Sequence, residues 1–457
     1  MALIDRIIAT SLLFLFALVP LIINPFALDY WYKPKIDSIY ALLIIAGILW
    51  IVKTVTVRKP LMIRKNPLFF PLLAYGLISL FSTVQSVDLK LSMYGDTFRE
   101  EGIFTIIAYI ALVFIFAHAV ESQHQIKKLL HGLLIASTII SLYAIIQFLG
   151  FNPTEHFIPL MRGIENRPGS TIGNPNFLGK FLVLILPLTI VSYCNATNTR
   201  IKYLFLTGCI ILFSALFLTF TRASWFSFGC SFIVLAILLS KKIAWRKQRE
   251  LIFIAALFII FAVLWESQSL AQKIIRGDNN TPTAVGKIGR IFNPNKGDVV
   301  ARLYLWKMAL TLITQRPILG YGPDTHTRVM EKFNLEYART FHYSGIIDRA
   351  HNNYLDIAIG QGLLGLAAYL LIIITFLFWL IKTMTAERNL NQKILYCGII
   401  AALCGYFIND FFIFSVVSVS PTFWSLMGLT IAMQRLSSMQ GIKSQGKHSA
   451  NLLCNKQ

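Results

Sequence analysis

The stretch IAIGQGLLGLAAYLLIIITFLFWLI, from Ile357 to Ile381, decides the class of fold because it contains no charged residue. A helix needs about 20 predominantly apolar residues to cross a membrane. Similar runs recur along the 457-residue chain, which is 56% hydrophobic and 14% charged, with a mean hydropathy of +0.64. A soluble domain carries about a quarter charged residues. The sequence therefore predicts an all-α, polytopic transmembrane helix bundle.

The apolar runs on either side of this stretch predict about 12 spans in the whole chain. The candidates are residues 7–25, 38–56, 67–86, 102–120, 129–150, 175–194, 201–220, 223–240, 250–267, 353–381, 394–415 and 420–435. The first resembles the core of a signal peptide. Because Asn24-Pro25-Phe26 follows it without a small-residue cleavage pattern, we expect a retained helix.

The distribution of lysine and arginine predicts the orientation, because these residues accumulate in cytoplasmic loops. Basic clusters follow the second and eighth predicted spans, at residues 53–65 and 241–249. With alternating spans, both termini are expected in the cytoplasm. This bias accounts for much of the net charge of +21, and no soluble domain offers a basic face, so we expect no nucleic-acid partner.

The predicted organisation has four parts. Residues 1–268 hold spans 1–9, residues 269–350 form a large external loop with short helices, residues 351–436 hold spans 10–12, and residues 437–457 form a polar cytoplasmic tail. The external loop is rich in arginine and lysine, which favours an anionic ligand on that face.

One helix is expected inside the external loop, from Ala301 to Gln315. Its three- and four-residue spacing places Leu303, Trp306, Leu310 and Ile313 on one face. Pro317 is expected to end it, and Gly320-Tyr321-Gly322-Pro323 predicts a tight turn.

The first candidate site precedes the sixth span, where Asn174-Pro175 is typical of a helix N-cap followed by the first turn. Such an N-terminus can bind an anion, and Arg167 adds a guanidinium that suits phosphate oxygens. A capped helix with a solvated arginine explains the same residues equally well.

The second and third candidates are charged residues at the outer ends of spans. Arg222 lies between two apolar runs, where an arginine either snorkels to the interface or serves a function. His351 lies beside Arg349 before the tenth span, where a histidine can act as a general base or fill a structural role. Asp410, inside the eleventh predicted span, is expected to pair with an arginine or to mark a proton path.

Metal-ligand spacing is absent from the sequence, which has no CxxC and no cluster of histidine and cysteine. The six cysteines fall in predicted spans or on the cytoplasmic side, so no disulfide framework is indicated. We expect neither a metal nor a cofactor.

These motifs together resemble a known family. His351-Asn352, nine residues, and then Gly362-Leu363-Leu364-Gly365 is similar to the H-[NSQ]-x9-G-x-x-G signature of the O-antigen ligase family. The order and spacing of other segments agree, as does the large loop between spans nine and ten. The segments are residues 173–177, residues 221–225, and Arg302 to Trp306 followed by residues 317–322.

The resemblance implies a metal-independent glycosyltransferase of the bacterial inner membrane. Its members move a glycan from a polyprenyl (undecaprenyl) pyrophosphate donor to a lipid or glycan acceptor on the outer face. Carried onto this sequence, His351 is the expected base. Arg222 and Arg302 are the expected catalytic arginines, and the expected pyrophosphate-binding residues are Arg167, Arg222, Arg302, Arg349 and Asn174.

The main alternative is a transporter of a small inorganic anion such as bicarbonate, with Asp410 and Arg222 lining the pathway. Against it stand the basic external loop and the absence of an evident inverted repeat of broken helices. A non-catalytic lipid-binding scaffold is a third reading.

Overall fold

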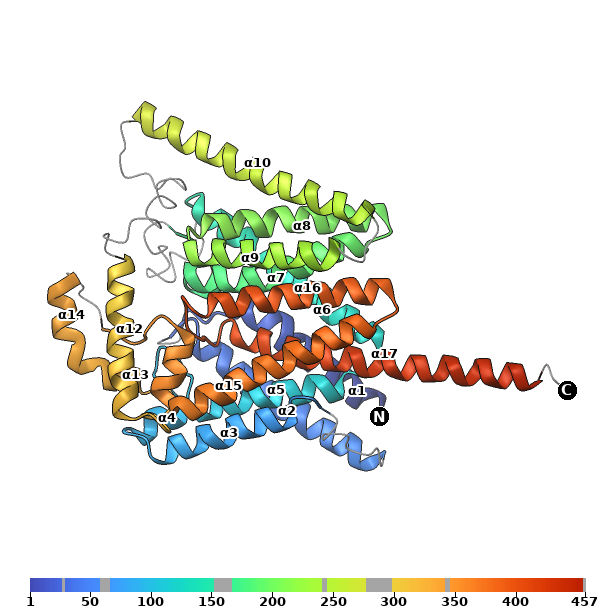
Figure 1. The fold of residues 1–457 in the computed structure, drawn as a ribbon, viewed down its shortest axis with the longest axis horizontal. Helices are drawn as coiled ribbons and strands as arrows, with labels where there is room; N and C mark the ends of the chain where they lie inside the picture. Colours follow the sequence, from blue (N-terminus) through green and yellow to red (C-terminus); the bar gives the residue numbers. More distant parts are fainter. Residues whose placement is uncertain are drawn as a thin grey trace.

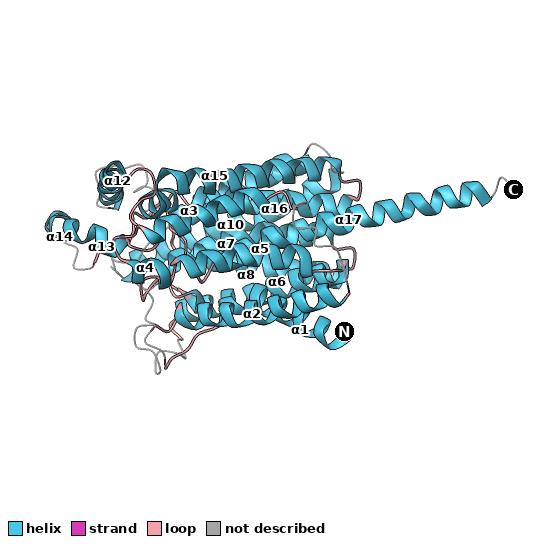
Figure 2. Cartoon of the chain, turned by 90° about the horizontal axis from the view of Figure 1, so that it is seen from below, coloured by secondary structure: helices cyan, strands magenta, loops and turns pink. Residues whose placement is uncertain are grey.

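The computed structural model describes residues 1–26, 29–57, 66–151, 167–240, 245–276, 298–341 and 346–454. Every regular element within these residues is a helix, so the all-α prediction is confirmed. The long helices lie side by side along one direction and form a bundle (Figures 1 and 2).

Eight helices of the described chain are long and apolar enough to cross a membrane. They are Ala2–Leu21, which combines α1 (Ala2–Leu13), η1 (Phe14–Leu18) and η2 (Val19–Leu21), then α2 (Lys33–Thr56), α6 (Gln123–Phe148), α7 (Pro175–Asn195), α8 (Thr199–Leu218), α9 (Arg222–Ser240), α15 (Asn353–Ala386) and α16 (Leu390–Asn409). Two shorter apolar helices are α3 (Phe69–Val84) and α5 (Ile103–Ala119). Each expected span falls on a helix, while the count of about 12 membrane crossings stays a prediction.

The remaining two expected spans lie on helices that extend beyond them. α10 (Trp245–Arg276) continues past residue 268, where the sequence places the start of the external loop. α17 (Ser420–Cys454) continues far past residue 436, so most of the expected polar tail belongs to the same helix.

The centre of the bundle is α7. Its residues are apolar on every face, as expected of a helix with protein on all sides, and 94% of its most apolar window is buried. α8, α9 and α16 pack directly against it. Asn174 accepts a hydrogen bond from the main-chain nitrogen of Asn176 at 2.8 Å, so the predicted N-cap of this helix is confirmed.

The two ends of the bundle differ. Both termini lie at one end, and the short helices α12 (Asp298–Gln315), α13 (His326–Met330) and α14 (Asn334–Phe341) lie at the other, called here the loop end (Figure 1). The loop end has a small hydrophobic core of its own, separate from that of the bundle. It includes Leu305, Met308, Leu312, Met330, Tyr337, Ile347 and Ile359.

The predicted helix in the external loop exists, and it ends at Gln315 before Pro317 as expected. Of the four residues predicted to share one face, Leu303 and Leu310 are exposed and Ile313 is buried, and the helix also buries Met308 and Leu312. Apolar residues occupy both faces of α12. The face that packs on α15 is decided by the loop-end core, and the sequence spacing alone does not indicate it.

α15 consists of two helices that meet at Gly362, where the chain leaves the helical conformation (φ +70°, ψ −175°). Residues 317–322 lie against this break. Main-chain nitrogens and carbonyl oxygens pair across it, from Tyr321 to Ile359, from Gly322 to Gly360, from Leu363 to Pro317 and from Leu364 to Ile318. Residues 317–322, which include most of the predicted Gly320–Pro323 segment, therefore pair through main-chain hydrogen bonds with residues 359–364, which include most of the G-x-x-G motif. We call this pairing the seam.

Glycine is required at the centre of this seam. A Cβ atom on Gly362 would lie 2.1 Å from the main-chain oxygen of Ile318, and its φ is one that other residues rarely adopt.

We expect Gly362→Ala to lower the free energy of unfolding by at least about 2 kcal/mol, because the added methyl group collides with main chain that cannot move away. Thermal unfolding in detergent measures this as a reduced Tm. Gly229→Ala is the matched control, because a Cβ at Gly229 in α9 meets nothing within 4 Å. Equal Tm values for the two variants would contradict the role assigned to the seam.

Candidate active site

His351 lies at the loop end, directly before the first helix of α15. Its φ is +53°, which is uncommon for a residue with a side chain and indicates a conformation held by its surroundings. The next residue, Asn352, is the N-cap, and its side chain accepts hydrogen bonds from the main-chain nitrogens of Tyr354 and Leu355. The cap fixes the point at which the helix begins, and with it the position of His351.

A buried ion pair supports this loop from below. Lys180 of α7 binds Asp410, which directly follows α16, and both side chains are fully buried. Asp410 also accepts, through its main-chain oxygen, a hydrogen bond of 2.8 Å from the nitrogen of Asn353. The expectation that Asp410 pairs with an arginine was therefore wrong. The lysine was overlooked because it lies inside an apolar span, where α7 directs it toward the end of α16.

The ring of Phe414 is the meeting point of three functional side chains. The His351 ring lies 5.4 Å from its centroid. The guanidinium groups of Arg99 and Arg349 lie 5.0 and 5.6 Å from the same centroid, within the range of cation–π contacts. Phe414 thus holds one imidazole and two cations close to one another.

Arg349 is held in a sealed pair with Asp324, with 3% of the arginine side chain exposed and none of the aspartate. Asp324 also accepts hydrogen bonds from the main-chain nitrogens of Asp96 and Glu101, at 2.7 and 2.9 Å. Burial disfavours the charge of Arg349, but Asp324 and the neighbouring carboxylates keep its pKa above the usual value. This arrangement fastens the segment before α5 to the segment that carries His351.

Arg99 and Asp348 form a second pair, which is more accessible. Arg99 donates from Nε to Oδ2 of Asp348 at 2.7 Å and also binds through Nη2, and 18% and 27% of the two side chains are exposed. Neither Arg99 nor Asp348 was predicted from the sequence to belong to the site. The available signal was Arg99-Glu100-Glu101, a charged group beside an apolar run on the face where the topology expects fewer charges.

Burial and these charges together lower the pKa of His351. Burial lowers the pKa of His351 to about 4, and the positive charges of Arg302, Arg99 and Arg349 add to the shift, while Asp348 opposes it. The imidazole is therefore neutral at neutral pH, the form that can accept a proton.

The predicted residues fall into two groups. Arg302 and Arg349 both act electrostatically on His351 at the loop end. Arg167, Asn174 and Arg222 lie where α7 and α9 begin, with Arg222 as the first residue of α9. Asn409 links the two groups. It is the neighbour of Asp410, and its side-chain nitrogen donates a hydrogen bond to Ser224 at 3.2 Å.

Arg167 binds several protein groups within the second group. Its Nε donates to the main-chain oxygen of Thr219 at 2.7 Å, and Nη2 donates to Asn176 and Thr221, each at 2.9 Å. Arg167 therefore ties the start of α7 to the turn that precedes Arg222.

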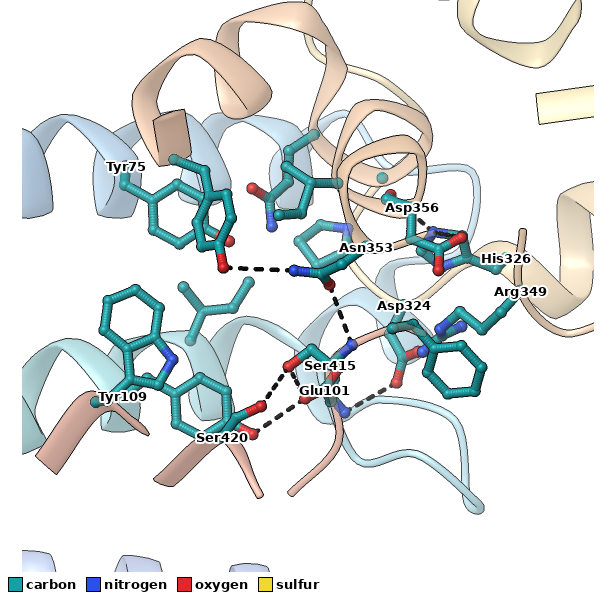
Figure 3. Close-up of a pocket in the computed structure, with 18 of the residues that line it drawn as sticks. Tyr75, Glu101, Tyr109, Asp324, His326, Arg349, Asn353, Asp356, Ser415 and Ser420 are labelled. Atoms are coloured by element: carbon teal, nitrogen blue, oxygen red, sulfur yellow. Dashed lines mark hydrogen bonds and ion pairs between the residues drawn. The ribbon is translucent and has the colours of Figure 1, made fainter. Parts of the chain in front are cut away.

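A cavity of about 70 Å³ is lined in part by Phe414 and Arg349 (Figure 3). Aromatic side chains form much of its wall, namely Tyr75, Tyr109, Tyr369, Tyr406, Phe423 and Trp424. Figure 3 shows Asp324, His326, Arg349 and Asp356 gathered at one end. Glu101 accepts from the Ser415 hydroxyl at 2.6 Å and from Tyr109 at 3.1 Å along another side.

Three acceptors in this wall have no hydrogen-bond partner among the described residues: Asp356 Oδ2, Gln361 Oε1 and His326 Nδ1. The histidine nitrogen is an acceptor because Nε2 donates to the main-chain oxygen of Asp356 and because burial lowers the pKa of His326 to about 3. Buried acceptors require donors, so the cavity suits water or hydroxyl groups.

The fold is that of a polytopic helical membrane protein, with a histidine and several arginines at one end of its bundle. Residues 207–370, which include Arg222, Arg302, Arg349 and His351, match the family model described as O-Antigen ligase. The chain is also 25% identical over 265 residues to the "General O-oligosaccharyltransferase" of Acinetobacter baylyi, covering 58% of this chain and 43% of that protein. Over residues 207–370 the chain is therefore similar to the O-antigen ligase family.

A further similarity joins this chain to an uncharacterized protein of Haemophilus influenzae, with 31% identity over 131 residues, 25% of this chain and 31% of that protein. The matches thus span less than half the length of either relative.

We expect Lys180→Met to lower the free energy of unfolding by about 3–5 kcal/mol, because it leaves the Asp410 carboxylate buried without its cation. Adding Asp410→Asn should restore part of the loss. Thermal unfolding in detergent tests both variants. Arg328→Met is the control, because Arg328 and Glu331 form an exposed pair that is expected to contribute less than about 1 kcal/mol. An unchanged Tm for Lys180→Met would refute the supporting role of the pair.

Proposed function

We propose that the protein transfers a glycan from a polyprenyl (undecaprenyl) pyrophosphate to a hydroxyl group of a lipid or glycan acceptor. The observation that carries this proposal is the neutral imidazole of His351, held among arginine side chains at one end of a membrane-spanning bundle. The match to the O-antigen ligase model and the similarity to an oligosaccharyltransferase support it.

The reaction is a displacement at the anomeric carbon. A ring nitrogen of His351 accepts the proton of the acceptor hydroxyl as its oxygen bonds to that carbon. The bond from the carbon to the pyrophosphate oxygen breaks, and polyprenyl pyrophosphate leaves with the electron pair. The configuration at the carbon is inverted, and no oxidant or reductant is needed.

The arginines stabilise the charge of the departing pyrophosphate. Arg222 and Arg302 are assigned to its oxygens, because a guanidinium donates through two parallel N–H groups and stays charged. They supply the positive charge that a metal ion supplies in other phosphate sites, so the proposed reaction is metal-independent. Asn174 places the N-terminus of α7 nearby, and Arg167 holds the turn before Arg222.

The loop end is proposed to face the periplasm, with both termini in the cytoplasm of a bacterial cell and the bundle in the inner membrane. Two observations support this orientation. The termini lie at the same end of the bundle, opposite α12–α14 (Figure 1). The basic clusters of the sequence follow predicted spans on the side where both termini are expected, as the positive-inside rule requires.

The alternative hypothesis, transport of a small inorganic anion, requires Asp410 to line a pathway. Asp410 is instead fully buried, bound to Lys180 and joined to the main chain beside His351. This position supports the loop that carries the base, so of the two residues expected to line a transport pathway only Arg222 is left.

We expect His351→Ala to reduce glycan transfer by at least about 100-fold while the protein still folds, because a general base contributes about 10²–10⁴-fold. Transfer by the purified protein in detergent, with a pyrophosphate-linked glycan donor, measures the effect. His124→Ala, an exposed histidine at the start of α6, is the control and should retain activity. Full activity in His351→Ala would refute the assignment of the base.

We also expect Arg222→Lys to reduce transfer by about tenfold or more, because lysine keeps the charge but loses the paired donors. Arg328→Lys, at an exposed arginine of α13, should behave as the unsubstituted protein. Equal activity of the two variants would remove Arg222 from the pyrophosphate site.

The pH dependence of kcat/KM follows from the lowered pKa of His351. A base acts in its neutral form, so kcat/KM should fall as the pH drops through about 4 and stay level from there to neutral pH. An acid limb near pH 6.5, the ordinary histidine value, would show that the cations do not act on the base as described.

A further inference from the structure

Two arginine–carboxylate pairs border the ring of Phe414, and they differ in access. Arg349 and Asp324 are sealed from solvent, with 3% and 0% of their side chains exposed. Arg99 and Asp348 keep 18% and 27% exposed. An incoming anion can therefore reach the second pair, while the first stays in place as part of the fold.

Asp348 has three cationic or potentially cationic neighbours, Arg99, Arg349 and His351. It accepts from Nε and Nη2 of Arg99, and it lies three residues before His351, close enough for the two charges to act on each other. His351 and Arg99 both pack on Phe414, with centroid distances of 5.4 and 5.0 Å. Asp348 is thus bound to the guanidinium that packs on the same ring as the His351 imidazole.

We propose that an incoming pyrophosphate takes Arg99 from Asp348, and that Asp348 then becomes the counter-ion of protonated His351. This inference rests on the proposed function, since it assigns two further residues to the same site. Arg99 is a pyrophosphate-binding residue in this scheme, and Asp348 is a positioning residue that acts through His351.

The exchange is favourable because each charge keeps an opposite charge. A pyrophosphate offers more negative charge to Arg99 than one carboxylate does, and Arg–phosphate hydrogen bonds are charge-assisted in the same way. When His351 takes the acceptor proton, the released Asp348 stabilises the imidazolium. Asp348 itself stays ionised, and the proton remains on His351 until water removes it.

The same exchange links donor binding to the strength of the base. Without donor, His351 faces Arg302 of α12, Arg99 from the segment before α5, and Arg349 and Asp348 of its own segment. The three cations disfavour its protonation and one carboxylate favours it. Bound pyrophosphate neutralises Arg99 and Arg302, so His351 becomes a stronger base only when the donor is present.

Binding of inorganic pyrophosphate to the full-length protein tests the exchange without any glycan transfer. Because Asp348→Asn frees Arg99 in advance, it should tighten binding by about threefold or more. Arg99→Gln should weaken binding by about tenfold. A pair that merely holds the fold together predicts weaker binding for both variants, or no change. Arg328→Gln, which opens an exposed pair with Glu331 at the same end, is the control.

The pH profile of the reaction tests the role of Asp348. The kcat profile reports the complex with donor, and kcat/KM reports the free protein. We expect the acid limb of kcat to lie at higher pH than that of kcat/KM, and Asp348→Asn to bring the two together while kcat falls about tenfold. Asp348→Asn with an unchanged kcat profile, or Arg99→Gln with unchanged pyrophosphate affinity, would overturn the inference.

The two proposals fail in different ways. If the unsubstituted protein transfers no glycan with any acceptor, the proposed function is contradicted. If transfer occurs and Asp348→Asn binds pyrophosphate no more tightly, the exchange alone is contradicted.

Discussion

The main-chain seam between residues 317–322 and residues 359–364 is the constraint on which the rest of the loop end depends. It holds the end of α12 against the break in α15, and Gly362 makes room for the contact. Because the first helix of α15 stops there, its N-terminus is fixed as well, and His351 precedes that N-terminus. The spacing between the histidine and the glycines thus has a mechanical reason: it is the length of one short helix.

The loop end contains ion pairs that differ in how deeply they are buried. Lys180 with Asp410 and Arg349 with Asp324 are buried, and each ties the His351 segment to a different part of the bundle. Arg99 with Asp348 is nearer to solvent. In the proposed function, the buried pairs preorganise the site and the accessible pair responds to substrate, so the donor meets fixed positive charge without a large rearrangement.

The sequence predicted the helical bundle and the N-cap at Asn174, because these depend on local hydropathy and backbone chemistry. It also identified His351 and Arg302, which the structure places within electrostatic reach of each other. Lys180, Arg99 and Asp348 escaped notice because their roles come from partners far away in the chain. The spacing within α12 did not indicate which of its apolar residues are buried, since apolar residues lie on more than one face of the helix.

The central claim is that an acceptor attacks a lipid pyrophosphate donor at the His351 site. The most direct measurement follows the release of free polyprenyl pyrophosphate from a glycan-loaded donor, by purified protein in detergent, with and without a mixed pool of acceptors. The proposed function predicts that free polyprenyl pyrophosphate is released only when acceptors are present. No release with any acceptor, from protein shown to be folded, would contradict it, and flux of a small inorganic anion into proteoliposomes would then be the activity to measure.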